Sequence, residues 1–315
     1  MSPADEATVS VLEVGGTHVT AAGVDIRARS LRSGLSFREA VDSDGSAEEI
    51  LSALVRCADR LSGLGAGPWA VALPGPFDYE RGIGRFEGVG KFEALRGVDL
   101  RAALTASLPG ATALSFCNDA DAFVLGEWWA GAARGHRTVA GITLGTGVGS
   151  CFLRDGRILR HGPGVPPEGW VHTLRYAGGP LEETVSRRAL RRAYARATGA
   201  APPDVLEIAR RARHGDRAAA EVFTETFRAL GKVLGPLLAA FEPTVLVVGG
   251  AIAGAWDLLA EPLRSGLTEA DPVRNRRVVI TPAHRPDEAP LLGAAYLAGG
   301  RGRPGDRTAP LGDSR

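Results

Sequence analysis

The order of hydrophobic and polar residues predicts strands and helices that alternate along the chain. Residues 7–14 and 17–26 alternate between apolar and polar positions on either side of Gly15-Gly16, which predicts a β-hairpin, and Ser30–Phe37 predicts a third strand. Beyond this point, helical spacing alternates with short apolar runs that are typical of buried strands. These patterns predict helices at about 46–62, 99–108 and 118–129, and buried strands at 68–75 and 111–117.

The second half of the chain repeats this plan. The segments RTVAGITLG and VGSCFLRDGRI are apolar stretches on either side of a Gly-Thr-Gly turn, and they predict a second hairpin. Later residues predict helices at about 181–197, 203–213, 216–240, 255–267 and 288–298, with strands at 243–250 and 276–283. The repeated plan predicts an α/β protein with duplicated domains and a ligand-binding cleft between the copies.

The same patterns suggest where the domains begin and end. We expect a smaller N-terminal α/β domain over 1–117 and a larger C-terminal α/β domain over 118–300, with the last helix, 288–298, able to pack back on the N-terminal domain. Residues 301–315 are rich in Gly, Pro and Arg, and a segment of this composition is predicted to be disordered.

Composition narrows the function classes without naming one. The 37 basic and 36 acidic residues nearly cancel, which argues against nucleic acid or an anionic membrane as a partner. Cys57, Cys117 and Cys151 lie far apart, so a disulfide scaffold and a CxxC metal motif are excluded. The first residues lack a signal-peptide pattern, and no apolar run reaches the ~20 residues of a membrane helix. We therefore expect a cytoplasmic protein.

Three glycine-rich segments end apolar strands: Glu13–Thr17, Leu144–Gly149 and Val247–Ile252. None fits the P-loop pattern, and LGTGVG is followed by an alternating, strand-like segment rather than by the helix of a dinucleotide-binding motif. Glycine in such turns lets backbone N–H groups approach an anion without interference from a Cβ atom. Each segment alone is also consistent with a plain hairpin turn, but three together favour phosphate binding.

These motifs, in this order, resemble those of the ROK family of sugar kinases over about residues 9–298. VLEVGGTHVTAAGVD is similar to the first phosphate motif of the family, VALPGPFD to its sugar-side segment, and CNDADAFVLGE to its Asn-Asp segment. ITLGTGVGS is similar to the second phosphate loop and EPTVLVVGGAI to the adenosine segment. The resemblance implies a two-lobed actin-like ATPase (ribonuclease H-like) fold with a central cleft, ATP and Mg²⁺ as cofactors, and a homodimer.

The resemblance also implies roles for individual residues. Asp119 corresponds to the general base and Asn118 to a sugar ligand, although Asn-Asp before a helix is also a common N-cap. Glu13 stands where the family usually has Asp, near Mg²⁺ and the phosphates, and its additional methylene changes the reach to the metal. The implied phosphate and adenosine ligands are Gly15, Gly16, Thr17, Gly145, Thr146, Gly147, Gly249 and Gly250, and Pro74 and Gly75 belong to the implied sugar side.

The remaining sugar-side segment departs from the family pattern. No cysteine lies between 167 and 190, so the Cys-rich zinc site of many family members cannot form and no zinc site is expected. Glu182 keeps its place as the implied sugar-binding carboxylate. Glu168 and His172 are four residues apart instead of three, so His172 is as consistent with a structural role as with sugar binding. Lys91, in a divergent loop with Phe86 and Glu87, is either part of the acceptor site or of a solvated loop.

We therefore expect a kinase that transfers phosphate from ATP to a hydroxyl group of a hexose or hexose-like polyol, as a glucokinase does. An amino sugar or a cyclitol is an alternative acceptor. A catalytically silent sugar sensor of the same fold is a second alternative, which the retained Asp119 disfavours and the change at Glu13 favours. A DNA-binding repressor is not expected, because the first phosphate motif begins near residue 11 and leaves no room for a preceding helix-turn-helix.

Overall fold

The computed structural model describes residues 8–299, and it divides into two compact units. Within these residues, unit 1 comprises 8–130 and 287–299, and unit 2 comprises 131–286. The division after Ala130 differs from the boundary expected at 117/118, because the helix that follows Asn118 packs within unit 1. The expected tail, 301–315, lies outside the described residues. Within residues 8–299, no helix is both long and apolar enough to cross a membrane.

A five-stranded sheet forms the centre of unit 1. Its order is β3-β2-β1-β4-β7, and its strands are β1 (Thr8–Val14), β2 (His18–Asp25), β3 (Ser30–Ala40), β4 (Gly67–Leu73) and β7 (Ala111–Asn118). The predicted hairpin is confirmed, since β1 and β2 are antiparallel with Val14 opposite Val19. Strands β1, β4 and β7 run parallel, so their carboxyl ends meet at one edge of the sheet.

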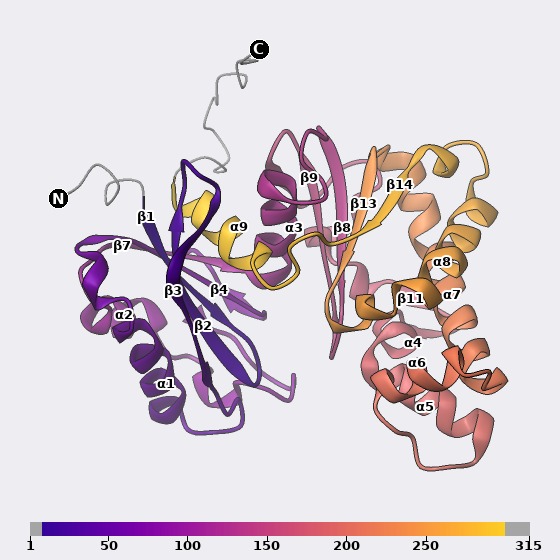
Figure 1. Cartoon of the computed structure of the whole chain (residues 1–315), viewed down its shortest axis with the longest axis horizontal. Coiled ribbons are helices and arrows are strands. Elements are labelled where there is room, and N and C mark those ends of the chain that lie inside the picture. The colour runs from indigo at the N-terminus through magenta and orange to yellow at the C-terminus, as the bar shows by residue number, and fades with distance from the viewer. Residues whose placement is uncertain (1–7, 300–315) are drawn as a thin grey trace. The chain divides into compact units, whose positions relative to one another are not determined.

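Two pairs of helices cover this sheet. The first pair is α1 (Ala47–Asp59), which begins at a capping box formed by Ser46 and Glu49, and α2 (Leu100–Ser107). The second pair is α3 (Asp119–Ala130) and α9 (Ala289–Ala298), which lie side by side in Figure 1. A Cβ atom at Gly126 would lie 1.9 Å from the Ala289 carbonyl oxygen. Glycine therefore allows the backbones of α3 and α9 to touch.

Unit 2 has a second sheet of the same design. Its order is β10-β9-β8-β13-β14, with β8 (Thr138–Leu144), β9 (Val148–Arg154), β10 (Arg157–Leu159), β13 (Val245–Gly249) and β14 (Val279–Pro282). The three strands from β8 to β10 form an antiparallel meander, and β8, β13 and β14 are parallel. Both sheets thus consist of a meander followed by parallel strands, which confirms the predicted duplication.

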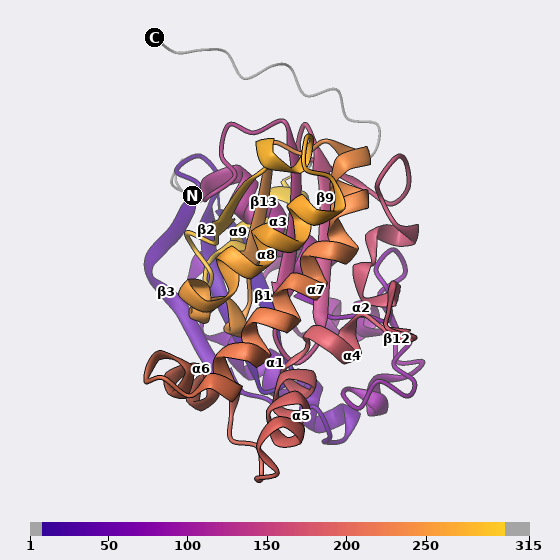
Figure 2. The same ribbon diagram turned by 90° about the vertical axis from the view of Figure 1, so that its right-hand side faces the viewer.

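Two long helices, α7 (Arg217–Phe241) and α8 (Trp256–Ala270), pack against each other and cross the strands of this sheet in Figure 2. The helix predicted over 181–197 is divided into α4 (Glu182–Val185) and α5 (Arg187–Thr198) by the extended Ser186, whose side chain caps α5. Helix α6 (Val205–Arg213) follows. The remaining short strands are β5 (Phe77–Asp78), β6 (Ile83–Gly84), β11 (Arg175–Tyr176) and β12 (Gly179–Pro180).

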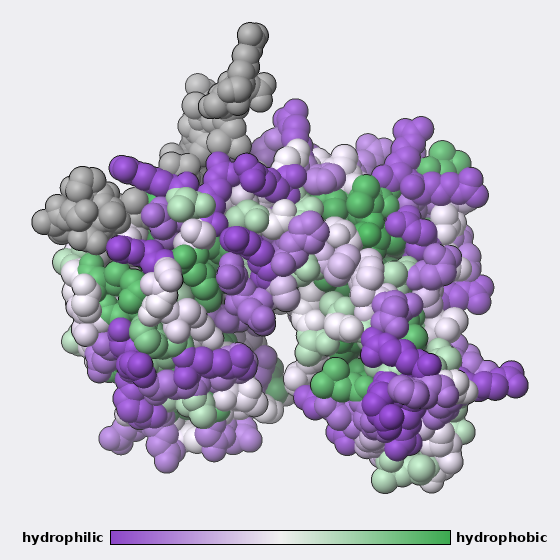
Figure 3. Space-filling view, in the orientation of Figure 1, coloured by the Kyte–Doolittle hydropathy of each residue, from purple (hydrophilic) through white to green (hydrophobic). Residues whose placement is uncertain are grey.

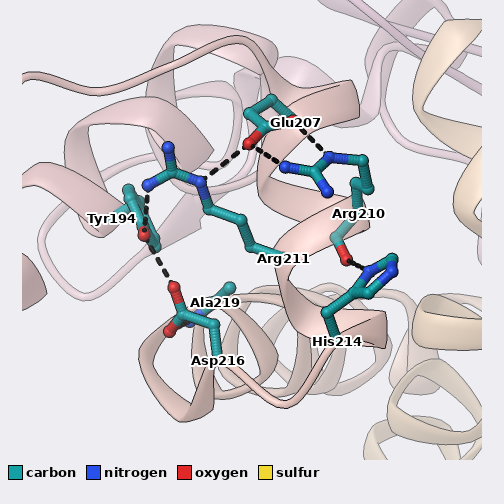
Figure 4. Close-up of polar contacts among 7 residues, drawn as sticks. All are labelled: Tyr194, Glu207, Arg210, Arg211, His214, Asp216 and Ala219. Atoms are coloured by element: carbon teal, nitrogen blue, oxygen red, sulfur yellow. Dashed lines mark hydrogen bonds and ion pairs between the residues drawn. The ribbon is translucent and has the colours of Figure 1, made fainter.

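Polar contacts join α5 and α6 to Asp216, the N-cap of α7. Tyr194 of α5 donates a hydrogen bond to Asp216 (2.7 Å) and accepts one from Arg211 of α6 (3.0 Å), as Figure 4 shows. Glu207 accepts from both Arg210 and Arg211, and these bonds lower the pKa of Glu207 to about 2. On the face of the molecule seen in Figure 3, hydrophobic residues form separate patches among hydrophilic ones.

Candidate active site

The sugar-side and catalytic residues expected in unit 1 converge at the carboxyl edge of its parallel strands. Glu13 is the penultimate residue of β1, Pro74-Gly75 follows β4 directly, and Asn118-Asp119 joins β7 to α3. The register places Leu73 opposite Asn118. The edge formed by the carboxyl ends of parallel strands is the usual binding edge of such sheets, because loops and helix N-termini open there. The fold therefore gathers residues that are up to 106 positions apart in sequence.

Asn118 is held in one orientation by hydrogen bonds on both sides of its amide. Its Oδ1 accepts from the backbone N–H groups of Ala120 (3.0 Å) and Asp121 (3.2 Å), which caps the first turn of α3. Its Nδ2 donates to the hydroxyl of Tyr79 (3.1 Å), and that hydroxyl donates to the Leu73 carbonyl oxygen (3.2 Å). The N-cap interpretation of Asn118 is thus correct for Oδ1, while the second hydrogen atom of Nδ2 is left for another acceptor.

Asp119 begins α3 and is partly buried. Burial raises the pKa of its carboxyl group, and the negative charge of Asp121 adds to the increase. The ammonium group of Lys91 and a hydrogen bond from the Ala120 N–H (2.9 Å) to Oδ1 oppose the shift. A carboxylate with a raised pKa accepts a proton more readily than an exposed one, which suits a general base.

Glu13 lies in a row of cross-strand neighbours. The register pairs Glu13 with Thr20 of β2, and Thr20 with Arg38 of β3. Burial, with a further contribution from the carboxylates of Asp119 and Asp287, raises the pKa of Glu13 to about 7, and Arg38 opposes the increase. Two acidic side chains and one basic side chain thus influence Glu13, and burial together with the acids makes its ionised form unfavourable.

The first glycine turn leaves side-chain space open at Gly16. The Gly15 N–H donates to the His18 carbonyl oxygen (2.8 Å), and Thr17 is exposed. Gly16 has no positive φ, and the nearest atom to a Cβ placed there would be the Ser43 Oγ, at 3.8 Å. Neither backbone conformation nor packing therefore requires glycine at position 16. A ligand that approaches the backbone closely would require it.

The second glycine turn contains one open and one filled position. A Cβ at Gly145 would meet nothing within 4 Å, and Thr146 beside it is exposed. A Cβ at Gly147 would lie 2.8 Å from Oε2 of Glu182, and this same oxygen accepts a hydrogen bond from the Val148 N–H (3.0 Å). The absence of a side chain at Gly147 thus makes room for Glu182, which lies against the turn.

The segment around His172 is brought close to Glu182. His172 lies in the 3₁₀ helix Val171–Thr173, where burial lowers its pKa and the negative charge of Glu182 opposes the shift. The Leu181 N–H donates to the Leu174 carbonyl oxygen, which closes the hairpin between the two residues. Glu168 is exposed, has a positive φ of 57°, and its carbonyl oxygen accepts from Arg160.

The third glycine segment is fixed by packing. Gly249 ends β13 and is buried, whereas Gly250 is exposed with a positive φ of 81°. A Cβ at Gly250 would lie 2.4 Å from the Leu144 carbonyl oxygen, at the end of β8. Glycine is therefore required at position 250 by the fold itself, whatever the segment binds.

The divergent loop before α2 is anchored at two residues. Phe86 and Phe92 are fully buried, so they belong to the core, and Glu87 pairs with Arg96 (2.9 Å). Lys91 lies next to the buried Phe92, and its charge lowers the pKa of Asp119. Of the two interpretations of Lys91, this influence favours a position near the candidate site.

Sequence reasoning missed three residues around the edge of unit 1: Tyr79, Arg38 and Asp287. The alternation of side chains between the two faces of β3 was a usable signal for Arg38, because it predicts which residues of the strand lie on the same face of the sheet. No local pattern marks Tyr79 or Asp287, since folding alone brings them to Asn118 and Glu13. Among residues 8–299, no cluster of three or more His, Cys, Asp or Glu side chains is arranged to hold a metal ion.

Comparisons with known proteins agree with the motifs. The ROK family model matches residues 9–301. The glucokinase of Thermotoga maritima is 31% identical over 252 residues, which cover 72% of this chain and 77% of that protein. The structure of a ROK hexokinase from Thermus thermophilus aligns with a TM-score of 0.76 and 28% identity over 94% of this chain and 100% of that one.

A ROK glucokinase from Streptomyces griseus, solved with glucose and AMPPNP, aligns with a TM-score of 0.75 and 26% identity, covering 93% of this chain and 99% of that one. These structures share the strand and helix arrangement described above along nearly the whole chain, which confirms the predicted actin-like fold class. The family match spans both units, from β1 to the end of α9. This chain belongs to the ROK family.

Proposed function

We propose that this sugar kinase transfers the γ-phosphoryl group of ATP to a hydroxyl group of a hexose, with Asp119 as the general base. The observation that carries the proposal is the arrangement at the carboxyl edge of unit 1, where the Asn118-Asp119 pair, Glu13 and an open glycine turn lie together. The named relatives of similar length, which are glucokinases and hexokinases, support the same reaction.

In this reaction, Asp119 accepts the proton of the acceptor hydroxyl as its oxygen attacks the γ-phosphorus, and the bond from that phosphorus to the bridging oxygen of ADP breaks. The raised pKa of Asp119 favours this proton transfer. The free N–H of Asn118 Nδ2 donates to a sugar hydroxyl, because Tyr79 and the first turn of α3 occupy the other positions of the amide.

The glycine turns with Gly15, Gly16 and Thr17 and with Gly145 and Thr146 are the proposed contacts for the phosphate groups of ATP. Gly16 and Gly145 support this assignment, since a side chain there would fill space that the protein leaves empty. Gly147, Gly249 and Gly250 would lie beside the nucleotide, although Gly147 and Gly250 are also required by packing against the protein itself.

Glu13 is the proposed Mg²⁺ contact. Magnesium is commonly held by one or two carboxylates together with water and substrate phosphates, and Glu13 would supply one such carboxylate. When bound, the ion would neutralise phosphate charge. Its positive charge would also lower the pKa of Glu13, which in the protein alone is raised to about 7.

Glu182 and His172 in unit 2, and Pro74 and Gly75 in unit 1, are the proposed sugar-side residues. Glu182 accepts a hydrogen bond at the second glycine turn and its charge acts on His172, so it would lie near both the sugar and the phosphate groups. Glu168 is exposed in the same loop and is proposed as a further contact.

A coupled ADP-release assay with ATP and Mg²⁺ tests the proposal. We expect turnover with at least one acceptor from a panel of hexoses, amino sugars and cyclitols, and its loss in the Asp119→Asn variant. The preferred class in the panel decides between a hexose and the amino sugar or cyclitol alternatives. No turnover with any acceptor, despite sugar binding, would establish the silent sensor instead. A homodimer is proposed on the family resemblance, and sedimentation velocity of the purified chain tests it, while the cytoplasmic location stays a prediction.

A further inference from the structure

One aromatic side chain stands out on the surface of unit 2. All five tryptophans lie within the described residues, and Trp170 alone is exposed, with 44% of its surface accessible. Its ring lies beside that of His172, with centroids 5.7 Å apart and planes inclined by 31°. An exposed tryptophan places a large apolar surface in water, which is unfavourable unless something covers it.

The loop holds Trp170 rigidly in this exposed position. The hydroxyl of Ser150, buried in β9, donates to the Gly169 carbonyl oxygen (2.5 Å) and accepts from the Val171 N–H (3.0 Å). Gly169 and Val171 are both buried, and Thr173 donates to the Trp170 carbonyl oxygen (2.8 Å). The residues on both sides of Trp170 are thus fixed to the sheet, while its ring remains outside.

Two residues of β9 bind Glu182 and the Trp170 loop, and their positions along the strand show how these groups follow one another. Val148 holds Glu182, and Ser150, two residues further, holds the Trp170 loop. Two residues of an extended strand span about 7 Å. The order in this part of unit 2 is therefore the Gly145 turn, then Glu182, whose charge acts on His172, and then Trp170, whose ring lies beside that of His172.

From this order we propose that Trp170, with His172 beside it, forms a subsite for a second ring attached to the acceptor sugar, so that the acceptor is a glycoside carrying a sugar or aromatic ring. The inference rests on the proposed function, in which the phosphorylated ring contacts Glu182 and His172. A ring linked to its far side would reach Trp170. The apolar C–H groups on one face of a pyranose, or an aromatic aglycone, would then cover the indole ring.

Acceptor pairs that differ only in the second ring test this subsite. We expect the wild type to phosphorylate a phenyl glucoside, in its α or its β anomer, with a KM about 3- to 10-fold below that of the matching methyl glucoside. Trp170→Ala is expected to remove this difference without changing the KM for the methyl glucoside, and Trp170→Phe to retain most of it. Leu206→Ala, which alters another exposed apolar side chain of unit 2, should behave as the wild type.

Binding without ATP separates this inference from the proposed function. A phenyl glucoside should change the tryptophan fluorescence of the wild type and not that of Trp170→Ala. If no acceptor is phosphorylated but this change occurs, the kinase assignment fails and the subsite stands. If methyl and phenyl glucosides have equal KM values, or if Trp170→Ala instead converts a dimer to a monomer in sedimentation, the subsite is overturned and the kinase assignment is unaffected.

Discussion

The two glycine turns occupy equivalent places in two sheets of the same design, and yet they present different chemistry. In the first turn, Glu13 is the penultimate residue of its strand, and in the second turn Thr143 has that place. The second turn receives its carboxylate from outside the sheet, since Glu182 of α4 accepts from the Val148 N–H. In unit 1 the strand before the turn carries the carboxylate itself, whereas in unit 2 a separate helix supplies it.

The difference lies in what surrounds each carboxylate. Glu13 is partly buried with other acids, and its pKa is raised to about 7, so its ionised form is unfavourable until a cation arrives. Glu182 receives a backbone N–H and lies over a glycine that leaves room for it. We infer that the first carboxylate is suited to a metal contact and the second to positioning, and five variants test this comparison.

The largest expected effect is in unit 1, at the proposed base. Asp119→Asn keeps the size of the side chain but cannot accept the hydroxyl proton, so we expect kcat to fall by about 10²- to 10⁴-fold. Steady-state kinetics with a saturating acceptor measure the change, and circular dichroism checks the fold. A variant that retains more than a tenth of the wild-type kcat would exclude Asp119 as the base.

Glu13→Gln tests how much the ionised carboxylate in the first turn lowers the free energy of unfolding. Because the pKa of Glu13 is about 7 in the folded protein and 4.5 in its unperturbed state, its ionisation removes stability as pH rises through this range. Without nucleotide or metal, the variant should therefore be about 2–3 kcal/mol more stable than wild type at pH 8 and within about 1 kcal/mol at pH 5.

Urea unfolding at both pH values measures the effect of Glu13→Gln. The exposed Glu48→Gln variant serves as the control, because a surface substitution should change stability by no more than about 0.5 kcal/mol at either pH. If the difference in stability between Glu13→Gln and wild type is the same at pH 5 as at pH 8, Glu13 is not a buried acid with a raised pKa.

Two alanine variants separate the two glycines of the second turn. Gly145→Ala adds a methyl group in open space, so stability should be unchanged while the KM for ATP rises by about 10-fold. Gly147→Ala displaces Glu182 from the Val148 N–H, so about 1 kcal/mol of stability is lost and the KM for the acceptor rises. Thermal unfolding measures stability, and steady-state kinetics measure the KM for ATP and for the acceptor. Equal changes in both variants would contradict the distinction between an open Gly145 and a filled Gly147.

The smallest effect is expected at Tyr79, which positions Asn118. Tyr79→Phe removes the acceptor of the Asn118 Nδ2 hydrogen bond, so the amide can turn, and the KM for the acceptor should rise about 3- to 10-fold with little change in kcat. Tyr194→Phe removes a hydroxyl with two hydrogen bonds in unit 2 and should affect stability only. Equal KM changes in both variants would show that Tyr79 has only a structural role.

Much of the fold could be read from short-range patterns. Period-two alternation located both hairpins, and helical spacing located α1, α7 and α9 to within a few residues. The division of the expected helix at Ser186 was missed, because a serine inside a run of helix-forming residues becomes an N-cap only when the preceding chain is held extended. The candidate residues were found as motifs, and their partners Tyr79, Arg38 and Asp287 were not.

The sequence by itself determined the order of elements, the family and the residue types available for chemistry. It also excluded a Cys-rich zinc site near 167–190. Only the tertiary structure decided which glycine is open and which is filled, which side of Asn118 is already occupied, and why the carboxyl group of Glu13 titrates near neutrality. The physical reason is that burial, charge and hydrogen bonding depend on neighbours in space, and parallel pairing brings those neighbours from distant parts of the chain.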